Sequence, residues 1–240
     1  MITIKNVTKK FDKSEVLNNV NLNFKKGECI ALIGPNGCGK TTLIKSILGM
    51  VVPTHGDVLF QDKSILGQFD YRKKIGYMPQ IGRYPDHMNI GQIIKMIKTI
   101  RNSHQDLDEE LIREFELEQI FDKPMRTLSG GTTQKVSASL AFLFNPDVLI
   151  LDEPTAGLDP LASEILKAKI IREKDNGKLI LITSHLLSEL DEMITQIIFM
   201  QEGKVHFHKT IADLLESTNE QKIAKAITKI LKTTSRESNN

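Results

Sequence analysis

Residues 29–42 read CIALIGPNGCGKTT. The run from Cys29 to Ile33 is unbroken and apolar, which is typical of a parallel strand that is buried on both faces. The stretch from Gly34 to Thr41 matches the pattern G-x-x-x-x-G-K-[ST], in which glycines let backbone N–H groups curl around phosphate oxygens. A helix is expected from about Lys40 to Leu48, and its N-terminus adds positive potential. This strand, loop and helix predict a binding site for a nucleotide phosphate chain.

Two side chains of this loop have expected roles in the chemistry. Lys40 is expected to reach the β- and γ-phosphates, and the hydroxyl of Thr41 to ligate Mg²⁺. A glycine turn without a ligand is the alternative, and the flanking strand and helix disfavour it. Cys38 is either an oxidisable thiol or a small residue that fills the loop, and we favour the filler because small size is all that this position needs.

A second apolar run ends in two acids. Val148 to Leu151 is followed directly by Asp152 and Glu153. Because ligands bind at the C-terminal ends of strands in open α/β sheets, we expect both carboxylates near the phosphate loop. Asp152 is then placed to hold Mg²⁺ through water, and Glu153 to polarise the attacking water. Two acids that merely cap a strand are the alternative, which the neighbouring phosphate loop disfavours.

Strands alternate with helices along most of the chain, which indicates an α/β core with a parallel sheet. Short strands with period-two alternation are expected at 2–7 and 16–24, ahead of the phosphate loop. The pattern becomes helical over residues 85–145, which we interpret as an inserted helical subdomain. We expect residues 1–216 to form one domain and residues 217–240 to form a polar, amphipathic tail.

Composition excludes several classes of protein. Lys plus Arg is 32 and Asp plus Glu is 30, which gives a formal net charge of +2. This balance argues against a dedicated nucleic-acid-binding protein, which usually has a clear basic excess. Two cysteines cannot form a disulfide framework, so a reducing compartment is expected. No stretch approaches the roughly 20 apolar residues of a membrane-spanning helix, and the N-terminus does not resemble a signal peptide. For action at a membrane, another chain would have to supply the spans.

Further short motifs follow in order along the chain. They are Gln80, Leu128-Ser129-Gly130-Gly131, Gly157-Leu158-Asp159-Pro160, and His185 after an apolar strand. Together with the phosphate loop and the acid pair, they resemble the motifs of the ABC ATPases over roughly residues 2–210. The resemblance implies a P-loop NTPase (RecA-like) fold, with a parallel-sheet core, an N-terminal antiparallel β subdomain and an inserted α-helical subdomain.

The resemblance also implies a composite site for ATP. Two such domains would close head to tail, with each ATP between one chain's phosphate loop and the other chain's LSGG signature (residues 128–131). A helix is expected from Thr132 onward, so that Ser129, Gly130 and Gly131 at its start would face the partner's γ-phosphate. Asp159 would contact the partner across the dimer. The family usually has Gln directly after the signature, and this sequence departs from that pattern with Thr132.

The implied catalytic residues are Glu153, His185 and Gln80. His185 would touch the γ-phosphate and help to organise the water, and Gln80 would sense Mg²⁺ and link the helical region to a membrane partner. A structural role for the histidine and a surface role for the glutamine are the alternatives, and position along the chain favours function for both. Phe11 either stacks on adenine or belongs to the core, and we favour stacking.

The resemblance assigns two groups of ligand-binding residues. The expected nucleotide-binding residues are Phe11, Val16, Gly34, Pro35, Asn36, Gly37, Cys38, Gly39, Lys40, Thr41, Thr42, Ser129, Gly130, Gly131 and Asp159. The expected Mg²⁺ ligands are Thr41, Gln80 and Asp152.

Three kinds of ABC protein compete as interpretations. Nucleic-acid or translation ABC proteins have tandem ATPase domains or long coiled coils, and the single motif set here excludes them. A soluble ABC ATPase of the iron–sulfur cluster assembly type often carries an acid where Thr132 stands, and it remains the alternative. The favoured interpretation is an ATP-hydrolysing transporter subunit, peripheral on the cytoplasmic face of the inner membrane. Its expected partners are separate membrane-spanning permease subunits and a second copy of itself, with a heterodimer left open and no nucleic acid.

Two stretches suggest a subgroup within the transporters. Residues 76–85 and 128–144 are similar to export-type ATPases of the systems that mature the copper enzyme nitrous-oxide reductase. In the tail, Ile223, Ile227, Ile230 and Leu231 lie on one helical face. That face either lies on an anionic membrane or packs on its own domain, and its short length favours packing.

Overall fold

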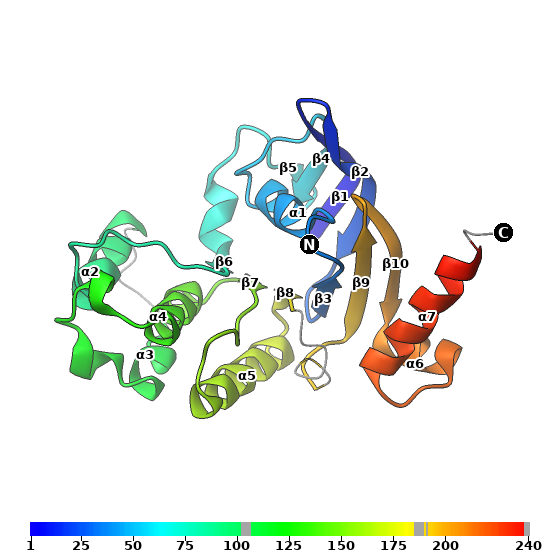
Figure 1. Cartoon of the computed structure of the whole chain (residues 1–240). Coiled ribbons are helices and arrows are strands. Elements are labelled where there is room, and N and C mark those ends of the chain that lie inside the picture. Colours follow the sequence, from blue (N-terminus) through cyan, green and yellow to red (C-terminus); the bar gives the residue numbers. More distant parts are fainter. Residues whose placement is uncertain (102–106, 185–189, 191, 238–240) are drawn as a thin grey trace.

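The structure is a computed structural model that describes residues 1–101, 107–184, 190 and 192–237. A six-stranded sheet forms its centre, in the order β10-β9-β3-β8-β7-β6 (Figure 1). Neighbouring strands run parallel except β9 and β10, which pair antiparallel. The strands are β3 (Cys29–Ile33), β6 (Ile75–Met78), β7 (Val148–Asp152), β8 (Leu179–Thr183), β9 (Gln196–Gln201) and β10 (Lys204–Thr210). Every residue of β3, β7 and β8 is buried, as the apolar runs predicted.

A second, antiparallel sheet comes from the N-terminal part of the chain, in the order β2-β1-β4-β5. Its strands are β1 (Ile2–Phe11), β2 (Ser14–Phe24), β4 (His55–Phe60) and β5 (Lys63–Ser64). The first two strands extend beyond the expected 2–7 and 16–24, because a hairpin continues their pairing up to Phe11 and Ser14. The antiparallel β subdomain predicted for this region is therefore confirmed.

The helices form two groups. The helices are α1 (Lys40–Ile47), α2 (Ile90–Arg101), α3 (Glu110–Glu114), α4 (Gly130–Phe142), α5 (Pro160–Asp175), α6 (Ile211–Thr218) and α7 (Ile223–Glu237), with short 3₁₀ turns η1 (Asp70–Lys74), η2 (Leu117–Ile120) and η3 (Met125–Thr127). Figure 1 shows α2, α3 and α4 together at one end of the molecule and α6 and α7 beside β10 at the other. The inserted helical subdomain is thus present between β6 and β7. Within the described ranges, no helix is both long and apolar enough to cross a membrane.

Alternate residues of the central strands supply two hydrophobic cores. Ile30 and Leu32 of β3 pack with the N-terminal sheet and α1, whereas Cys29 and Ala31 of the same strand pack with the helices on the other face. This division follows from the two-residue period of a strand. Burial raises the pKa of the Cys29 thiol to about 12, so that residue is an inert core thiol.

The helical subdomain approaches the central sheet closely at one glycine. A Cβ atom on Gly76 of β6 would lie 2.0 Å from the carbonyl oxygen of Ala141 in α4. Only glycine permits this backbone contact, which brings α4 against the edge strand of the sheet.

A group of charges around a buried lysine also joins the subdomain to the core. Lys169 of α5 is 4% exposed, and its ammonium lies 2.5 Å from Asp108, 3.0 Å from Glu110 and 2.8 Å from Glu173. Arg172 pairs with Glu110, and Lys178 lies 2.5 Å from Glu173. We call these six residues the Lys169 cluster. Because Asp108 and Glu110 lie at the start of α3, the cluster fixes that helix against α5.

The C-terminal segment forms helices that pack on the domain. Four apolar side chains of α6 and α7 are buried in the same hydrophobic core as Cys29, Ala31 and the helical subdomain. They are Leu214, Ile223, Ala226 and Ile227. The apolar stripe predicted for this segment therefore packs on its own domain along these residues, and α6 runs past residue 216 to Thr218.

Candidate functional site

A cavity of about 560 Å³ opens at the N-terminal end of α1. It brings together three segments that are far apart in the sequence: the phosphate loop, the turn after β6 and the end of β7. Its lining residues are Val16, Asn36, Gly37, Gly39, Lys40, Thr41, Thr42, Gln80, Asp152 and Glu153. Each of these residues belongs to the predicted site.

Two glycines give the phosphate loop its path. Gly34 has a φ of 150°, and a Cβ atom there would lie 2.1 Å from the carbonyl oxygen of Met200 in β9. Gly39 has a φ of 107°, and a Cβ atom there would lie 2.7 Å from the carbonyl oxygen of Val16. The loop therefore curls tightly between the two sheets, with the first turn of α1 directly behind it.

Lys40 is held within the same loop. Its ammonium donates hydrogen bonds to the carbonyl oxygens of Gly34 at 2.7 Å and Pro35 at 3.2 Å, and it lies 3.9 Å from the sulfur of Cys38. In the described part of the chain, no carboxylate forms an ion pair with Lys40. The carbonyl dipoles thus hold the ammonium at the cavity, and its positive charge suits a site that receives an anion.

The two acids are positioned from the neighbouring strand. Asp152 is buried at the end of β7 and accepts a hydrogen bond from the hydroxyl of Thr183, its register partner on β8. The backbone N–H of Glu153 donates to the carbonyl and hydroxyl oxygens of Thr183, both at 3.1 Å. Glu153 has a φ of 51°, a left-handed conformation that is uncommon for a residue with a side chain. Sequence reasoning missed Thr183, although its place at the end of an adjacent strand was a usable signal.

The LSGG signature lies at the start of α4. The hydroxyl of Ser129 accepts from the N–H of Thr132 at 3.2 Å, so Ser129 caps the helix. The helix therefore begins at Gly130 and not at Thr132 as predicted, because the cap precedes both glycines. Further along α4, the buried amide of Gln134 donates to the carbonyl oxygen of Glu153 at 3.3 Å. This contact, which sequence reasoning missed, ties the signature helix to the acid pair.

The signature also contacts the turn that contains Asp159. A Cβ atom on Gly131 would lie 2.6 Å from the carbonyl oxygen of Gly157. Asp159 caps α5 by accepting from the N–H of Ala162 at 2.9 Å, and it lies 2.7 Å from the ammonium of Lys135 in α4. The hydrogen bond from Lys135 lowers the pKa of the Asp159 carboxyl. The signature residues and Asp159 are thus brought together, but they do not line the cavity of their own phosphate loop.

Four other predicted residues among those that the structure describes are not part of the cavity lining: Phe11, Gly34, Pro35 and Cys38. Phe11 is 46% exposed at the tip of the β1–β2 hairpin, so the interpretation of it as a core residue is wrong. The ammonium of Lys9 lies 4.8 Å from the centre of its ring. Within the phosphate loop, Cys38 is buried and Pro35 is exposed. His185 lies outside the described residues.

The residues present fit both a nucleotide and Mg²⁺. Thr41, Gln80 and Asp152 bring a hydroxyl, an amide and a carboxylate to one cavity, and Mg²⁺ prefers such oxygen ligands. Among the described residues there is no group of three or more His, Cys, Asp or Glu that could form an all-protein metal site.

Comparisons with known proteins agree with this geometry. The profile of the ABC transporter family matches residues 17–156. Lantibiotic transport ATP-binding protein SrtF of Streptococcus pyogenes is 34% identical over 209 residues, which cover 87% of this chain and 90% of that protein. A solved ATP-binding subunit of an ABC transporter superposes with a TM-score of 0.88 at 25% identity, covering 96% of this chain and 99% of the other. A dimeric ATP-binding cassette in a post-hydrolysis state with ADP and Pi superposes with a TM-score of 0.75 at 26% identity, covering 88% and 99%.

Proposed function

The chain belongs to the ABC transporter family, and we propose that it is the ATP-hydrolysing subunit of a transporter whose membrane-spanning subunits are separate chains. The cavity that joins the phosphate loop, Gln80 and the Asp152–Glu153 pair carries this proposal. The chain is an ATPase, and it would work at the cytoplasmic face of the cell membrane as a peripheral protein. The organisation into residues 1–216, with the insertion 85–145, and a tail of 217–240 belongs to the same proposal.

The phosphate loop and the first turn of α1 would bind the triphosphate. The backbone N–H groups from Gly37 to Thr42 would hold the phosphate oxygens at the positive end of the helix. Lys40 would exchange its bonds to the Gly34 and Pro35 carbonyls for bonds to phosphate oxygens, which accept more strongly because they are charged. Phe11 is exposed ahead of the loop and would stack on the base.

Thr41, Gln80 and Asp152 would hold Mg²⁺, which when bound neutralises charge that develops on the β- and γ-phosphate oxygens. Thr183 fixes the Asp152 carboxylate through its hydroxyl. The same residue holds the backbone of Glu153, so the two acids keep a fixed orientation relative to each other. Glu153 would accept the proton of the attacking water, and His185 stays a predicted contributor to the organisation of that water.

A second copy of the chain would complete each ATP site. Ser129, Gly130 and Gly131 begin α4 and do not line their own chain's cavity, so their N–H groups would serve the γ-phosphate of a partner. The dimeric cassette that resembles this chain supports such an arrangement. The similarity to export-type ATPases of nitrous-oxide reductase maturation stays a prediction, and SrtF is itself a lantibiotic transport protein.

A comparison of Glu153→Gln with wild type tests the proposal. We expect Mg²⁺-dependent ATP hydrolysis by the wild type and a loss of about 10²- to 10⁴-fold in Glu153→Gln, because a positioned general base contributes about that much. The variant should still bind ATP and should accumulate as a dimer in size-exclusion chromatography. Glu118→Gln, at an exposed site on η2, is the matched control and should keep full activity. Hydrolysis by Glu153→Gln at the wild-type rate would disprove the role of this base.

A further inference from the structure

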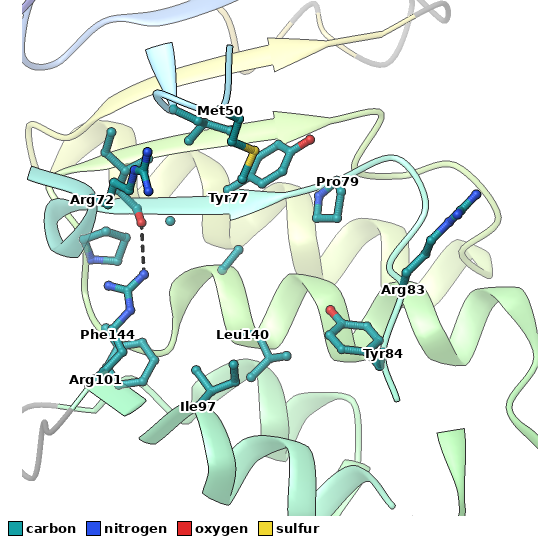
Figure 2. Close-up of a pocket in the computed structure, with 15 residues that line it drawn as sticks. Met50, Arg72, Tyr77, Pro79, Arg83, Tyr84, Ile97, Arg101, Leu140 and Phe144 are labelled. Atoms are coloured by element: carbon teal, nitrogen blue, oxygen red, sulfur yellow. Dashed lines mark hydrogen bonds between the residues drawn. The ribbon is translucent and has the colours of Figure 1, made fainter. Parts of the chain in front are cut away.

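The stretch of chain that leaves β6 brings Gln80 to the nucleotide cavity and then continues without helix or strand structure. Figure 2 shows Pro79, Arg83 and Tyr84 in order along it, beside a second cavity of about 540 Å³ between β6 and the helices α2 and α4. The side chain of Arg83 points away from the ring of Tyr84. We call residues 80–84 the Gln80 segment.

One hydrogen bond holds the Gln80 segment to the rest of the protein. The hydroxyl oxygen of Tyr84 lies 2.9 Å from the hydroxyl oxygen of Ser137 in α4. Across the described ranges of the chain, this is the only hydrogen bond that residues 80–84 form, through either backbone or side chain. The position of Gln80 therefore depends on this bond and on the packing around it.

The two hydroxyl groups depend on each other. Ser137 is 1% exposed, and among the described residues its hydroxyl has no hydrogen-bond partner other than Tyr84. Burial raises the pKa of Tyr84, so its phenol group stays protonated at neutral pH and can donate or accept. Because a buried hydroxyl without a partner is costly, each group keeps the other in place.

Gly82 allows the Gln80 segment to approach α4 this closely. A Cβ atom at residue 82 would lie 2.2 Å from the hydroxyl oxygen of Ser137 and 2.8 Å from the ring of Tyr84. Any larger residue at this position would push the two hydroxyl groups apart. The segment is thus fastened to α4 only a few residues after Gln80.

The same part of α4 also contacts the other side of the nucleotide cavity. Gln134 precedes Ser137 by three residues and donates to the carbonyl oxygen of Glu153 at 3.3 Å. Residues that are three apart lie on one face of a helix. Because Gln80 and Glu153 both line the cavity, one face of α4 contacts the two chain segments that carry them.

We propose that Tyr84 and Ser137 are positioning residues, whose hydroxyl pair holds Gln80 in the nucleotide cavity at the place where its amide would bind Mg²⁺. This role rests on the proposed function and assigns a task in it to two side chains that do not touch the nucleotide cavity themselves. Without the pair, the Gln80 segment would have no hydrogen bond to α4, and Gln80 would lie in the binding position for less of the time. A displacement of about 1 Å at a reacting site can cost roughly 10²-fold in rate.

Tyr84→Phe tests the role, because it removes one hydroxyl and keeps the ring. The rate of hydrolysis at saturating Mg²⁺ and ATP should fall about tenfold, the lower end of the range for groups that orient a metal ligand. Binding of the fluorescent analogue mant-ATP in EDTA should be unchanged, because without the metal Gln80 has no ion to bind. Tyr71→Phe is the matched control and should keep the wild-type rate. The Tyr71 hydroxyl also donates to a backbone carbonyl, that of Ile47 at 3.2 Å, and it lines neither cavity.

Two double variants separate positioning from stability. Tyr84→Phe combined with Ser137→Ala leaves no buried hydroxyl without a partner, so its Tm should recover toward that of the wild type while the loss of hydrolysis persists. Gln80→Ala should lower the rate by itself. Adding Tyr84→Phe to Gln80→Ala should then change the rate by less than about twofold, because a residue that acts through Gln80 has nothing left to position.

Three results would overturn the positioning role. They are a wild-type rate in Tyr84→Phe, a recovery of hydrolysis together with Tm in Tyr84→Phe/Ser137→Ala, and a further loss of about tenfold when Tyr84→Phe is added to Gln80→Ala. The second result would leave the pair with a purely structural role, and the third would show that Tyr84 acts independently of Gln80. Absence of ATP hydrolysis in the wild-type chain would refute the proposed function, whereas equal hydrolysis by the wild type and Tyr84→Phe would refute the positioning role alone.

Discussion

Replacing Lys169 by methionine should remove the central charge of the Lys169 cluster and destabilise the whole protein. The side chain of Lys169 is 4% exposed and its ammonium lies within 3.0 Å of three carboxylates, of which Glu173 is buried, so its loss leaves their negative charge less compensated. Breaking a buried ion pair from one side costs about 3–5 kcal/mol. Arg172 and Lys178 remain beside Glu110 and Glu173, and for that reason we expect the lower end, about 3 kcal/mol.

Thermal unfolding followed by circular dichroism gives the measurement. For a domain of this size, 1 kcal/mol corresponds to about 2–4 °C, so Lys169→Met should lower Tm by about 6–12 °C. Lys167→Met on the same helix is the matched control. Its ion pair with Glu164, a side chain that is 73% exposed, should contribute less than about 0.5 kcal/mol.

A double-mutant cycle shows whether the loss arises within the cluster. Asp108→Asn alone removes one of the three carboxylates, and in the Lys169→Met background it should cost far less or even restore stability, because the uncompensated charge decreases. Equal melting temperatures for Lys169→Met and Lys167→Met would refute the reasoning. Strict additivity of Lys169→Met and Asp108→Asn would show that the two residues do not interact.

Three other predictions follow from particular contacts. Burial opposes ionisation of Glu173, but hydrogen bonds from Lys169 and Lys178 lower the pKa of its carboxyl below the ordinary value of 4.5. Its contribution to stability should therefore be present above about pH 4.5 and be lost as the pH falls further, which urea unfolding at a series of acidic pH values would measure. Gly76→Ala places a Cβ 2.0 Å from the Ala141 carbonyl and should cost about 1–3 kcal/mol or more in chemical denaturation, whereas Gly91→Ala, with its nearest atom at 3.5 Å, should be neutral or stabilising. Thr183→Val removes the hydroxyl that positions Asp152 and Glu153 and should lower kcat for ATP about tenfold or more while the fold, checked by circular dichroism, is kept.

The sequence motifs predicted the parts of the fold and site that depend on neighbouring residues. The strand, phosphate loop and helix from Cys29 onward could be predicted from local sequence. Their signals, an apolar run followed by glycines, depend only on residues that are neighbours in the chain. The buried strands β7 and β8 could be predicted in the same way, from their unbroken apolar runs. The start of α4 was misplaced, because its position depends on whether Ser129 or a later residue acts as the cap.

Contacts between distant segments could not be predicted in this way. Thr183 reaches Asp152 only because β7 and β8 are paired in a particular register. Gln134 reaches Glu153 because α4 packs against the end of β7, and Asp108 reaches Lys169 because α3 packs against α5. Each contact depends on how elements pack, and the hydrophobic patterns of single segments do not contain that information.

The links between α4 and the acid pair have a consequence for the kinetics of a dimer. Gln134 holds the backbone of Glu153, Gly131 touches Gly157, and Lys135 pairs with Asp159. In the proposed head-to-tail dimer, Glu153 of one chain would serve as general base at one ATP, and α4 of the same chain would contact the other ATP. Occupation of either site would therefore change the geometry of the other through a single rigid connection. ATP hydrolysis should then be positively cooperative, with a Hill coefficient approaching about 2, and Gln134→Ala should bring that coefficient toward 1.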